Sequence, residues 1–239
     1  MKKWILIIAL FPYLLVAQTK ENNDSVFSAL PFKSQQLIVP GALVALSMYS
    51  SLYWDHPMQK QIVKWNGNTS IDDVSIFIPG ASAYILDWCG ISSKHNFTDK
   101  AVITTTTAVL TLGSTFLLKE MTNVMRPDGS NNKSFPSMHT AVAFAGAELL
   151  WQEYKDQSVW YGIAGYGIAT GSGLLRMYNN KHWFSDVLVG TGVGILSTRA
   201  AYWMFPSLKK LYSADRHKEI SVLPFVSGNE IGFGLSARF

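Results

Sequence analysis

The chain has 239 residues, of which 48% are hydrophobic and only 15% are charged. Soluble domains carry about 25% charged residues, so this composition excludes a disordered chain and argues against an ordinary soluble globule. The net charge is +4 without a basic run or a repeat of aromatic and basic residues, which gives no support for a nucleic-acid partner. Cys89 is the one cysteine, so the sequence contains neither a disulfide framework nor a cysteine-based metal site.

The first residues have the pattern of a secretory signal. Two lysines precede an apolar run over residues 4–17, which ends at the small residue Ala17 and is followed by polar residues. This pattern predicts a signal peptide over 1–17, cleaved after Ala17, and a polar, irregular segment over 18–36. The alternative is an uncleaved anchor helix, against which Pro12 and the short run argue. Both interpretations place the protein in the cell envelope.

The body of the chain is predicted to be helical. Apolar segments of about the length that crosses a bilayer cover residues 37–54, 101–118, 135–151, 159–175 and 187–205. A shorter segment, 74–86, is interrupted by Pro79-Gly80. We therefore expect an all-α bundle of about five to six helices over 37–205, embedded in the membrane. A soluble bundle packed through small residues is the alternative.

Two glycine pairs with a spacing of four residues lie in this body. Gly167 and Gly171 form one pair, and Gly190 and Gly194 form the other. This spacing allows helices to approach closely in lipid.

The tail over 206–239 has a different pattern. Apolar residues alternate with small or polar ones from Ile231 to Phe239, a period of two that predicts a strand. Residues 220–226 suggest a weaker partner strand, and Ser227-Gly228-Asn229 suggests the turn. Because a single hairpin cannot close a barrel, we interpret it as an appendix to the helical body.

The first motif is a pair of cations at the end of the 101–118 segment. Lys119 and Arg126 are seven residues apart, which is two helical turns, so both side chains are expected on one side of that helix. Pro127 is expected to end the helix. Two cations aimed at one point can bind an anion. The alternative is a pair of surface cations flanking a membrane helix.

The second motif is Ser134-Phe-Pro-Ser-Met-His-Thr140, at the entry to an apolar helix. Pro136 suits the first turn of a helix, where the backbone amides lack internal partners and can bind phosphate. Ser137 adds a hydroxyl donor, and His139 is placed to transfer a proton. The alternative is a helix cap with an incidental histidine.

The third motif runs from Arg176 to Asp186. His182 and Asp186 are four residues apart and are expected to be neighbours on one helical face. A carboxylate on one imidazole nitrogen fixes the tautomer and leaves the other nitrogen free, which is how a histidine nucleophile is activated. The alternative is a structural pair that caps the last helix.

The three motifs together resemble one family. Lys-x6-Arg-Pro, then Pro-Ser-x-His, then Arg-x5-His-x3-Asp occur in that order on successive helix ends. This combination resembles the type 2 phosphatidic acid phosphatase and vanadium haloperoxidase superfamily, over about residues 100–205. Three spaced motifs are far more specific than any one of them.

The resemblance implies a role for each matching position. His182 would attack phosphorus and form a phosphohistidine, Asp186 would orient it, and His139 would protonate the leaving oxygen and then activate water. The phosphoryl oxygens would be held by Lys119, Arg126, Ser137, the Met138 amide and Arg176. These roles fit phosphoryl transfer, in which positioning and charge stabilisation do nearly all the work. No metal or other cofactor is expected, since the sequence has no metal-binding motif.

Three departures from the family pattern concern the substrate pocket. Met138 stands where the family usually has glycine, and its side chain would narrow the pocket. Leu175 replaces a serine, which removes one hydroxyl donor. The segment between Pro127 and Pro136 is also shorter than usual, which would leave the site more open.

Alternation of helices across a membrane places all three motifs on one side. The resemblance implies an inner-membrane protein with its active site facing the periplasm, which requires that the 74–86 segment does not cross. Several lysines then fall inside, as the positive-inside rule expects: Lys94, Lys100, Lys155, Lys209 and Lys210. The alternative is a soluble or peripheral periplasmic protein.

The sequence therefore predicts an envelope phosphatase that hydrolyses phosphate monoesters or diphosphates, with lipid phosphates as the favoured substrates and membrane lipids as further partners. Candidates implied by the family are phosphatidate, phosphatidylglycerol phosphate, undecaprenyl pyrophosphate and lipid A phosphate. A soluble periplasmic acid phosphatase of low specificity is the first alternative. A vanadate-dependent haloperoxidase, for which the chain is short, and a non-enzymatic membrane protein are the others. The oligomeric state is not predicted.

Overall fold

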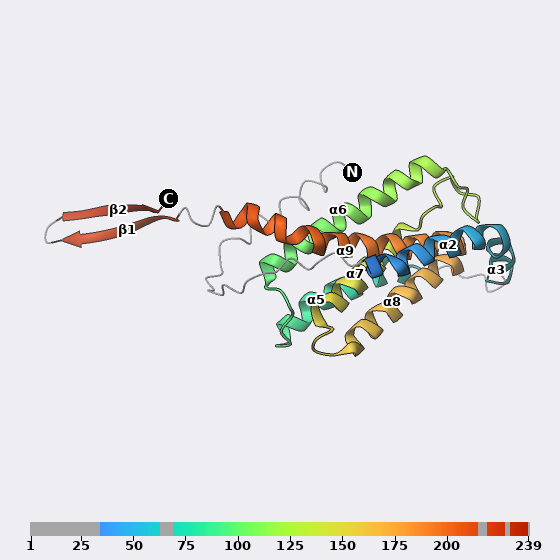
Figure 1. Cartoon of the computed structure of the whole chain (residues 1–239), viewed down its shortest axis with the longest axis horizontal. Coiled ribbons are helices and arrows are strands. Elements are labelled where there is room, and N and C mark those ends of the chain that lie inside the picture. The colour runs from blue at the N-terminus through green and yellow to red at the C-terminus, as the bar shows by residue number, and fades with distance from the viewer. Residues whose placement is uncertain (1–33, 63–68, 215–218, 228–229, 239) are drawn as a thin grey trace. The chain divides into compact units, whose positions relative to one another are not determined.

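The computed structural model describes residues 34–62, 69–214, 219–227 and 230–238 (Figure 1). The chain divides into two compact units, Met1–Trp203 and Met204–Phe239. The expected signal peptide and residues 18–33 lie outside the described residues. The next residues form a short 3-10 helix, η1 (Ser34–Leu37), where we expected irregular chain.

The first unit is all helical in its described part, which confirms the predicted class. Its elements after η1 are α2 (Ile38–Tyr53), α3 (Asp55–Ile62), α4 (Ile71–Ser75), α5 (Ile78–Trp88), α6 (Phe97–Thr122), α7 (Met138–Tyr154), α8 (Val159–Tyr178) and most of α9 (Phe184–Ala214). The described part thus has eight α-helices where five to six were expected. The additional ones are short: α3 was not predicted, and the segment that contains Pro79 is divided into α4 and α5.

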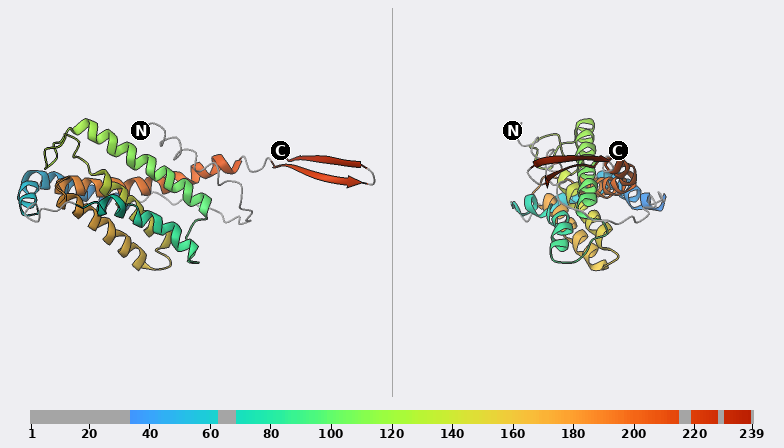
Figure 2. Two further views of the ribbon diagram at one scale, coloured as in Figure 1. Left: turned by 180° about the vertical axis from the view of Figure 1, so that it is seen from behind. Right: turned by 90° about the vertical axis from the view of Figure 1, so that its left-hand side faces the viewer.

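Helix α7 is the central element of the first unit. It packs against α5, α6 and α8, and it also meets α9 (Figures 1 and 2). Eleven of its 17 residues are buried, and many of these are alanines. Small side chains let neighbouring backbones approach closely. At the crossing with α5, a Cβ built on Gly146 would lie 2.6 Å from the backbone nitrogen of Gly80.

One of the two glycine pairs lies at a close helix contact, which its spacing allows. A Cβ on Gly194 would lie 2.3 Å from the Ala141 carbonyl oxygen, and one on Gly190 would lie 2.6 Å from the Ser137 carbonyl oxygen. Gly167 and Gly171 make no such contact, because no atom lies within 4 Å of a Cβ built on either of them. Close packing therefore joins α9 to α7, the two helices that carry the second and third motifs.

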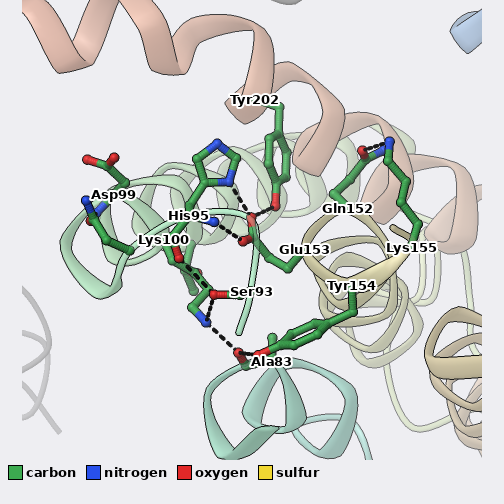
Figure 3. A network of polar contacts seen from close by, with 12 residues as sticks. Ala83, Ser93, His95, Asp99, Lys100, Gln152, Glu153, Tyr154, Lys155 and Tyr202 are labelled. Atoms are coloured by element: carbon green, nitrogen blue, oxygen red, sulfur yellow. Dashed lines mark hydrogen bonds and ion pairs between the residues drawn. The ribbon is translucent and has the colours of Figure 1, made fainter. Parts of the chain in front are cut away.

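Charged side chains inside the bundle are paired rather than isolated. Around Glu153, the ring nitrogen Nδ1 of His95 lies 2.8 Å from the carboxylate, and the Tyr202 hydroxyl donates to it (Figure 3). Lys100 donates to the Ala83 carbonyl at 2.6 Å and also pairs with a carboxylate of α5. Buried charges are tolerated when they are paired in this way. The network joins α5, the start of α6 and α9 to the C-terminal end of α7.

The charges that interrupt two of the predicted apolar segments also pair with each other. Arg199 of α9 donates to Glu148 of α7 at 2.9 Å, and the Tyr166 hydroxyl of α8 donates to the same carboxylate. This pair explains how α7 and α9 carry charge and remain in the interior of the bundle.

Among the described residues, two helices are long and apolar enough to cross a membrane. They cover Gln35–Tyr53, with a mean hydropathy of 1.3, and Phe97–Thr122, with a mean hydropathy of 1.6. A core helix of a soluble protein would be mostly buried, whereas these windows are 17% and 22% buried. The exposed apolar side chains include Leu52 on α2 and Phe116 on α6. Both helices therefore present apolar surface outward.

The second unit contains the end of α9 and two strands, β1 (Glu219–Ser227) and β2 (Glu230–Arg238). The strands pair antiparallel, with Glu219 opposite Arg238 and Ser227 opposite Glu230. Two residues of the expected turn, 228 and 229, lie outside the described residues.

Candidate active site

His182 and Asp186 lie together in the interior, at the connection between α8 and α9. Both side chains are buried, and Nδ1 of His182 lies 3.4 Å from Oδ2 of Asp186. The pair does not share a helical face as expected, because α9 begins at Phe184 and His182 precedes it. Instead, Asp186 in the first turn accepts the Trp183 amide at 2.8 Å and so holds the connection in place. The carboxylate therefore both orients the imidazole and secures the start of α9.

Burial sets the protonation state of His182. Burial is the largest cause that lowers the pKa of His182; Asp186 raises it, the charges of Lys119 and Arg176 lower it, and the net pKa is about 4. The imidazole is therefore neutral at pH 7, with one nitrogen free of a proton. A neutral imidazole is the form that can act as a nucleophile.

Ser134 links the first two motifs to this pair. Its hydroxyl donates to Oδ2 of Asp186, and its carbonyl accepts a hydrogen bond of 3.2 Å from Nζ of Lys119. Lys119 also donates to the Lys133 carbonyl at 2.8 Å. A chain of contacts thus runs from the end of α6 through the segment before α7 to His182.

Arg126 does not continue the helix of Lys119, which corrects the sequence interpretation. Helix α6 ends at Thr122, because Asn123 adopts a left-handed conformation with φ of 49°, four residues before Pro127. Arg126 therefore lies in the loop that follows. Its Nε is buried without a hydrogen-bond partner among the described residues. Burial lowers the pKa of Arg126, and the nearby charge of Arg176 lowers it further.

The second motif caps α7. Ser137 is the N-cap, and its Oγ accepts hydrogen bonds from the Thr140 amide at 3.4 Å and the Thr140 hydroxyl at 2.9 Å. The Ser137 amide donates to the Asp186 carbonyl at 3.0 Å. Met138 is the first helical residue, where a backbone amide has no partner within the helix. The helix start is thus fixed directly beside Asp186.

Arg176 is oriented by a residue of α4, a helix that was given no functional role from the sequence. Asp72 of α4 is buried and accepts a hydrogen bond from Nη1 of Arg176. Asn179 donates to the other oxygen of Asp72 at 3.0 Å. Nε of Arg176 is buried and has no partner among the described residues. The guanidinium is therefore oriented on one side and keeps a donor for a ligand on the other.

His139 also meets α4. Its Nε2 lies 3.1 Å from Oδ1 of Asp73, and the same oxygen lies 3.8 Å from Nη1 of Arg176. Burial lowers the pKa of His139, the charge of Arg176 lowers it further, and Asp73 acts in the opposite direction. Asp73 thus joins the second motif to the third.

Sequence analysis missed the acidic residues that support the site. Asp55 of α3 accepts the Ser185 amide at 2.9 Å and the Ser185 hydroxyl, and so supports the start of α9. The pair Asp72-Asp73 stands directly before an apolar segment and was visible as two adjacent carboxylates. Ser134 was quoted within the second motif without a role. In the described residues, no group of three or more His, Cys, Asp or Glu side chains could hold a metal ion.

The predicted residues are therefore connected in the structure. The contacts given above join Lys119, Ser137, His182 and Asp186 into one set, and His139 and Arg176 into a second one through Asp73. The charge of Arg176 acts on His182, and Arg126 lies within electrostatic range of Arg176 and Asp186. Two unpartnered guanidinium nitrogens and a neutral buried histidine are groups that could bind a tetrahedral oxyanion and attack it.

A cavity of about 490 Å³ lies next to this set. It is bounded by α2, α3, the end of α6, the loop before α7 and the start of α9. Met48, Met125, Phe135 and Trp183 contribute apolar lining, and Asp186 also faces it. The cavity is therefore adjacent to the Asp186 side chain of the His182–Asp186 pair. Both α2 and α6, the helices long and apolar enough to cross a membrane, contribute to its wall.

Comparison with known proteins gives three findings. The sequence model of the PAP2 superfamily matches residues 100–210. A protein of Porphyromonas gingivalis named lipid A 1-phosphatase is 37% identical over 138 residues, which cover 57% of this chain and 31% of that protein. The chain thus matches about a third of that relative's length. The crystal structure of Aquifex aeolicus LpxE has a TM-score of 0.45 at 21% identity, covering 62% of this chain and 93% of that one.

Proposed function

Since residues 100–210 match the sequence model of the PAP2 superfamily, we propose that the protein is a phosphatase that hydrolyses phosphate monoesters or diphosphates of lipids through a phosphohistidine intermediate. His182 attacks phosphorus while Asp186 orients its ring. His139 protonates the leaving oxygen and then activates the water that releases phosphate. One histidine thus acts as the nucleophile and the other as the general acid and base.

The observation that carries the proposal is the environment of His182. Its neutral imidazole is buried and lies within range of the charges of Lys119 from the first motif and Arg176 from the third, with Asp186 3.4 Å from one ring nitrogen. Lys119, Arg126 and Arg176 supply the positive charge that a phosphoryl group needs as its bonds to the leaving and attacking atoms change. The Ser137 hydroxyl and the Met138 amide complete the set of donors.

Two observations favour a lipid substrate over a small soluble ester. The curated relative from Porphyromonas gingivalis is named for its action on lipid A. The cavity beside Asp186 has apolar lining and is bounded by α2 and α6, so an acyl chain could occupy it while the phosphate reaches His182. The outward apolar surface of α2 and α6 supports a position of this cavity at the bilayer. The protein would then be an inner-membrane enzyme whose site faces the periplasm.

The test is phosphate release from purified protein with a panel of substrates. The panel holds phosphatidate, phosphatidylglycerol phosphate, undecaprenyl pyrophosphate, lipid A and p-nitrophenyl phosphate. We expect release from at least one lipid and its abolition in His182→Ala. A loss of less than tenfold in that variant would contradict the role of His182. Release from p-nitrophenyl phosphate alone would favour the soluble acid phosphatase.

The intermediate can be tested separately. Reaction with a ³²P-labelled substrate and rapid quenching should leave label on the protein that is lost in acid and kept in alkali, as a phosphoramidate bond requires. The label should be missing from His182→Ala. Label that survives acid would indicate a different nucleophile.

The proposed role of the cavity in lipid binding can be tested in the same assay with two tryptophan variants. Met48→Trp adds bulk to its lining, whereas Leu52→Trp adds the same bulk on the same helix at a position that is exposed and outside the lining. We expect Met48→Trp to raise the KM for the lipid several-fold and to leave turnover of p-nitrophenyl phosphate unchanged, with no effect of Leu52→Trp.

A further inference from the structure

We propose that Asp73 is a positioning residue for His139, holding its ring by a hydrogen bond at Nε2 so that Nδ1 of the protonated ring is directed to donate to the leaving oxygen. The inference rests on the proposed function, because it assigns His139 the acid role in that reaction. It adds an acidic residue that lies outside all three motifs and outside the part of the chain that matches the family.

The contact is specific in geometry. Oδ1 of Asp73 lies 3.1 Å from Nε2 of His139, within hydrogen-bonding distance. The carboxylate comes from α4 and the imidazole from the first turn of α7, so the bond joins elements 66 residues apart in the chain. A carboxylate on one ring nitrogen fixes which nitrogen carries the proton when the ring is neutral, and it favours the doubly protonated ring.

His139 needs such a partner because its other surroundings oppose its charge. The charged groups that act on it are Arg176 of α8 and the two carboxylates of α4, Asp72 and Asp73. Burial and the Arg176 charge both disfavour the imidazolium. Asp72 pairs with Arg176 directly, so Asp73 is the carboxylate in contact with the histidine.

The exposure and the neighbours of Asp73 argue that it does not serve mainly to stabilise the fold. Its side chain is 61% exposed, whereas that of Asp72 is 1% exposed. An exposed carboxylate contributes little to stability, so its removal should leave the fold intact. Its nearest groups are a proposed acid and a proposed phosphate ligand, because Arg176 lies 3.8 Å away. A residue in this position acts on the chemistry.

The direct test measures the protonation of His139 by NMR of ¹⁵N-histidine-labelled protein, assigned with a His139→Gln variant. We expect Asp73→Asn to lower the pKa of His139 by at least about half a unit, and Asp73→Glu to restore part of the shift. The matched control is Asp156→Asn, which removes an exposed carboxylate after the opposite end of α7. The control should leave the pKa of His139 unchanged.

Kinetics of the same variants give the second readout. Asp73→Asn should lower kcat roughly three- to tenfold at pH 7 with little change in KM, and should move the loss of activity at high pH to lower pH. An unchanged His139 pKa overturns the proposal even in an active enzyme. A lower KM with undiminished kcat also overturns it, because it would mean that Asp73 competes with the substrate for Arg176. A shifted pKa in a protein without phosphatase activity would defeat the proposed function and leave the Asp73–His139 coupling standing.

Discussion

At the scale of single residues, the two histidines predict an acidic pH optimum. His182 must be neutral to attack, so activity should rise as the pH increases through its pKa of about 4. His139 must be protonated to act as an acid, so activity should fall as the pH increases through its pKa. Burial and Arg176 lower the pKa of His139 below the ordinary value of about 6.5. We therefore expect a bell-shaped profile of kcat/KM with its maximum between about pH 4 and pH 6.5.

The substrate also titrates in this range, since the second pKa of a phosphate monoester is about 6. The variant His139→Gln separates the two effects: the limb that disappears belongs to the enzyme, and the limb that remains belongs to the substrate. An optimum above pH 8 would contradict the assignment of both histidines.

Residue identities were the most predictable part of the site. The motif spacing pointed to His182 and Asp186, and the structure places them in contact. The contacts of Asp72 with Arg176 and of Asp73 with His139 could not be predicted from motif spacing, because both aspartates lie on a separate short helix. Contacts between distant segments depend on how the helices pack, and adjacent carboxylates alone do not tell which cations they meet.

At the scale of elements, close packing of α9 on α7 predicts opposite effects for two glycine substitutions. Gly194→Ala places a Cβ 2.3 Å from the Ala141 carbonyl and 2.8 Å from the Ala145 amide, so the helices must separate. Overpacking of this kind costs about 1–3 kcal/mol. Gly167→Ala on α8 is the control, because nothing lies within 4 Å of its Cβ and alanine favours the helix. We expect thermal unfolding at lower temperature for Gly194→Ala and at equal or higher temperature for Gly167→Ala.

The same two substitutions should also differ in their effect on activity. The start of α9 carries Asp186, and its carbonyl accepts the Ser137 amide, so a displaced α9 disturbs two motifs together. Gly194→Ala should therefore lower kcat as well as stability. A melting temperature equal to that of the unmodified protein would contradict the close approach of the two helices.

Element boundaries were less predictable than element types. Hydrophobic segments correctly indicated the long helices, but Pro127 did not end α6, because Asn123 had already reversed the backbone in a left-handed conformation. The resulting loop is tied to the α8–α9 connection, since Lys181 pairs with Asp128 at 2.8 Å and the Trp183 indole donates to the Met125 carbonyl at 2.8 Å. A pattern of apolar residues contains little information on such local hydrogen bonds.

At the scale of the whole molecule, the two ends of α6 predict a labelling experiment. The chain's single thiol, Cys89, is exposed at the end of α5, shortly before α6 begins. The loop after α6 carries Arg126 and leads to the second motif. If α6 crosses the membrane once with the proposed active site in the periplasm, Cys89 faces the cytoplasm and this loop faces outward.

An impermeant maleimide distinguishes the two sides. In spheroplasts, we expect no labelling of Cys89 until the membrane is lysed. The variant Asn132→Cys in a Cys89→Ser background should label at once, because residue 132 is exposed in the loop after α6. A permeant maleimide should label both proteins and so shows that each thiol is reactive. The reverse pattern would place the active site in the cytoplasm, and immediate labelling of both thiols would mean that α6 does not cross.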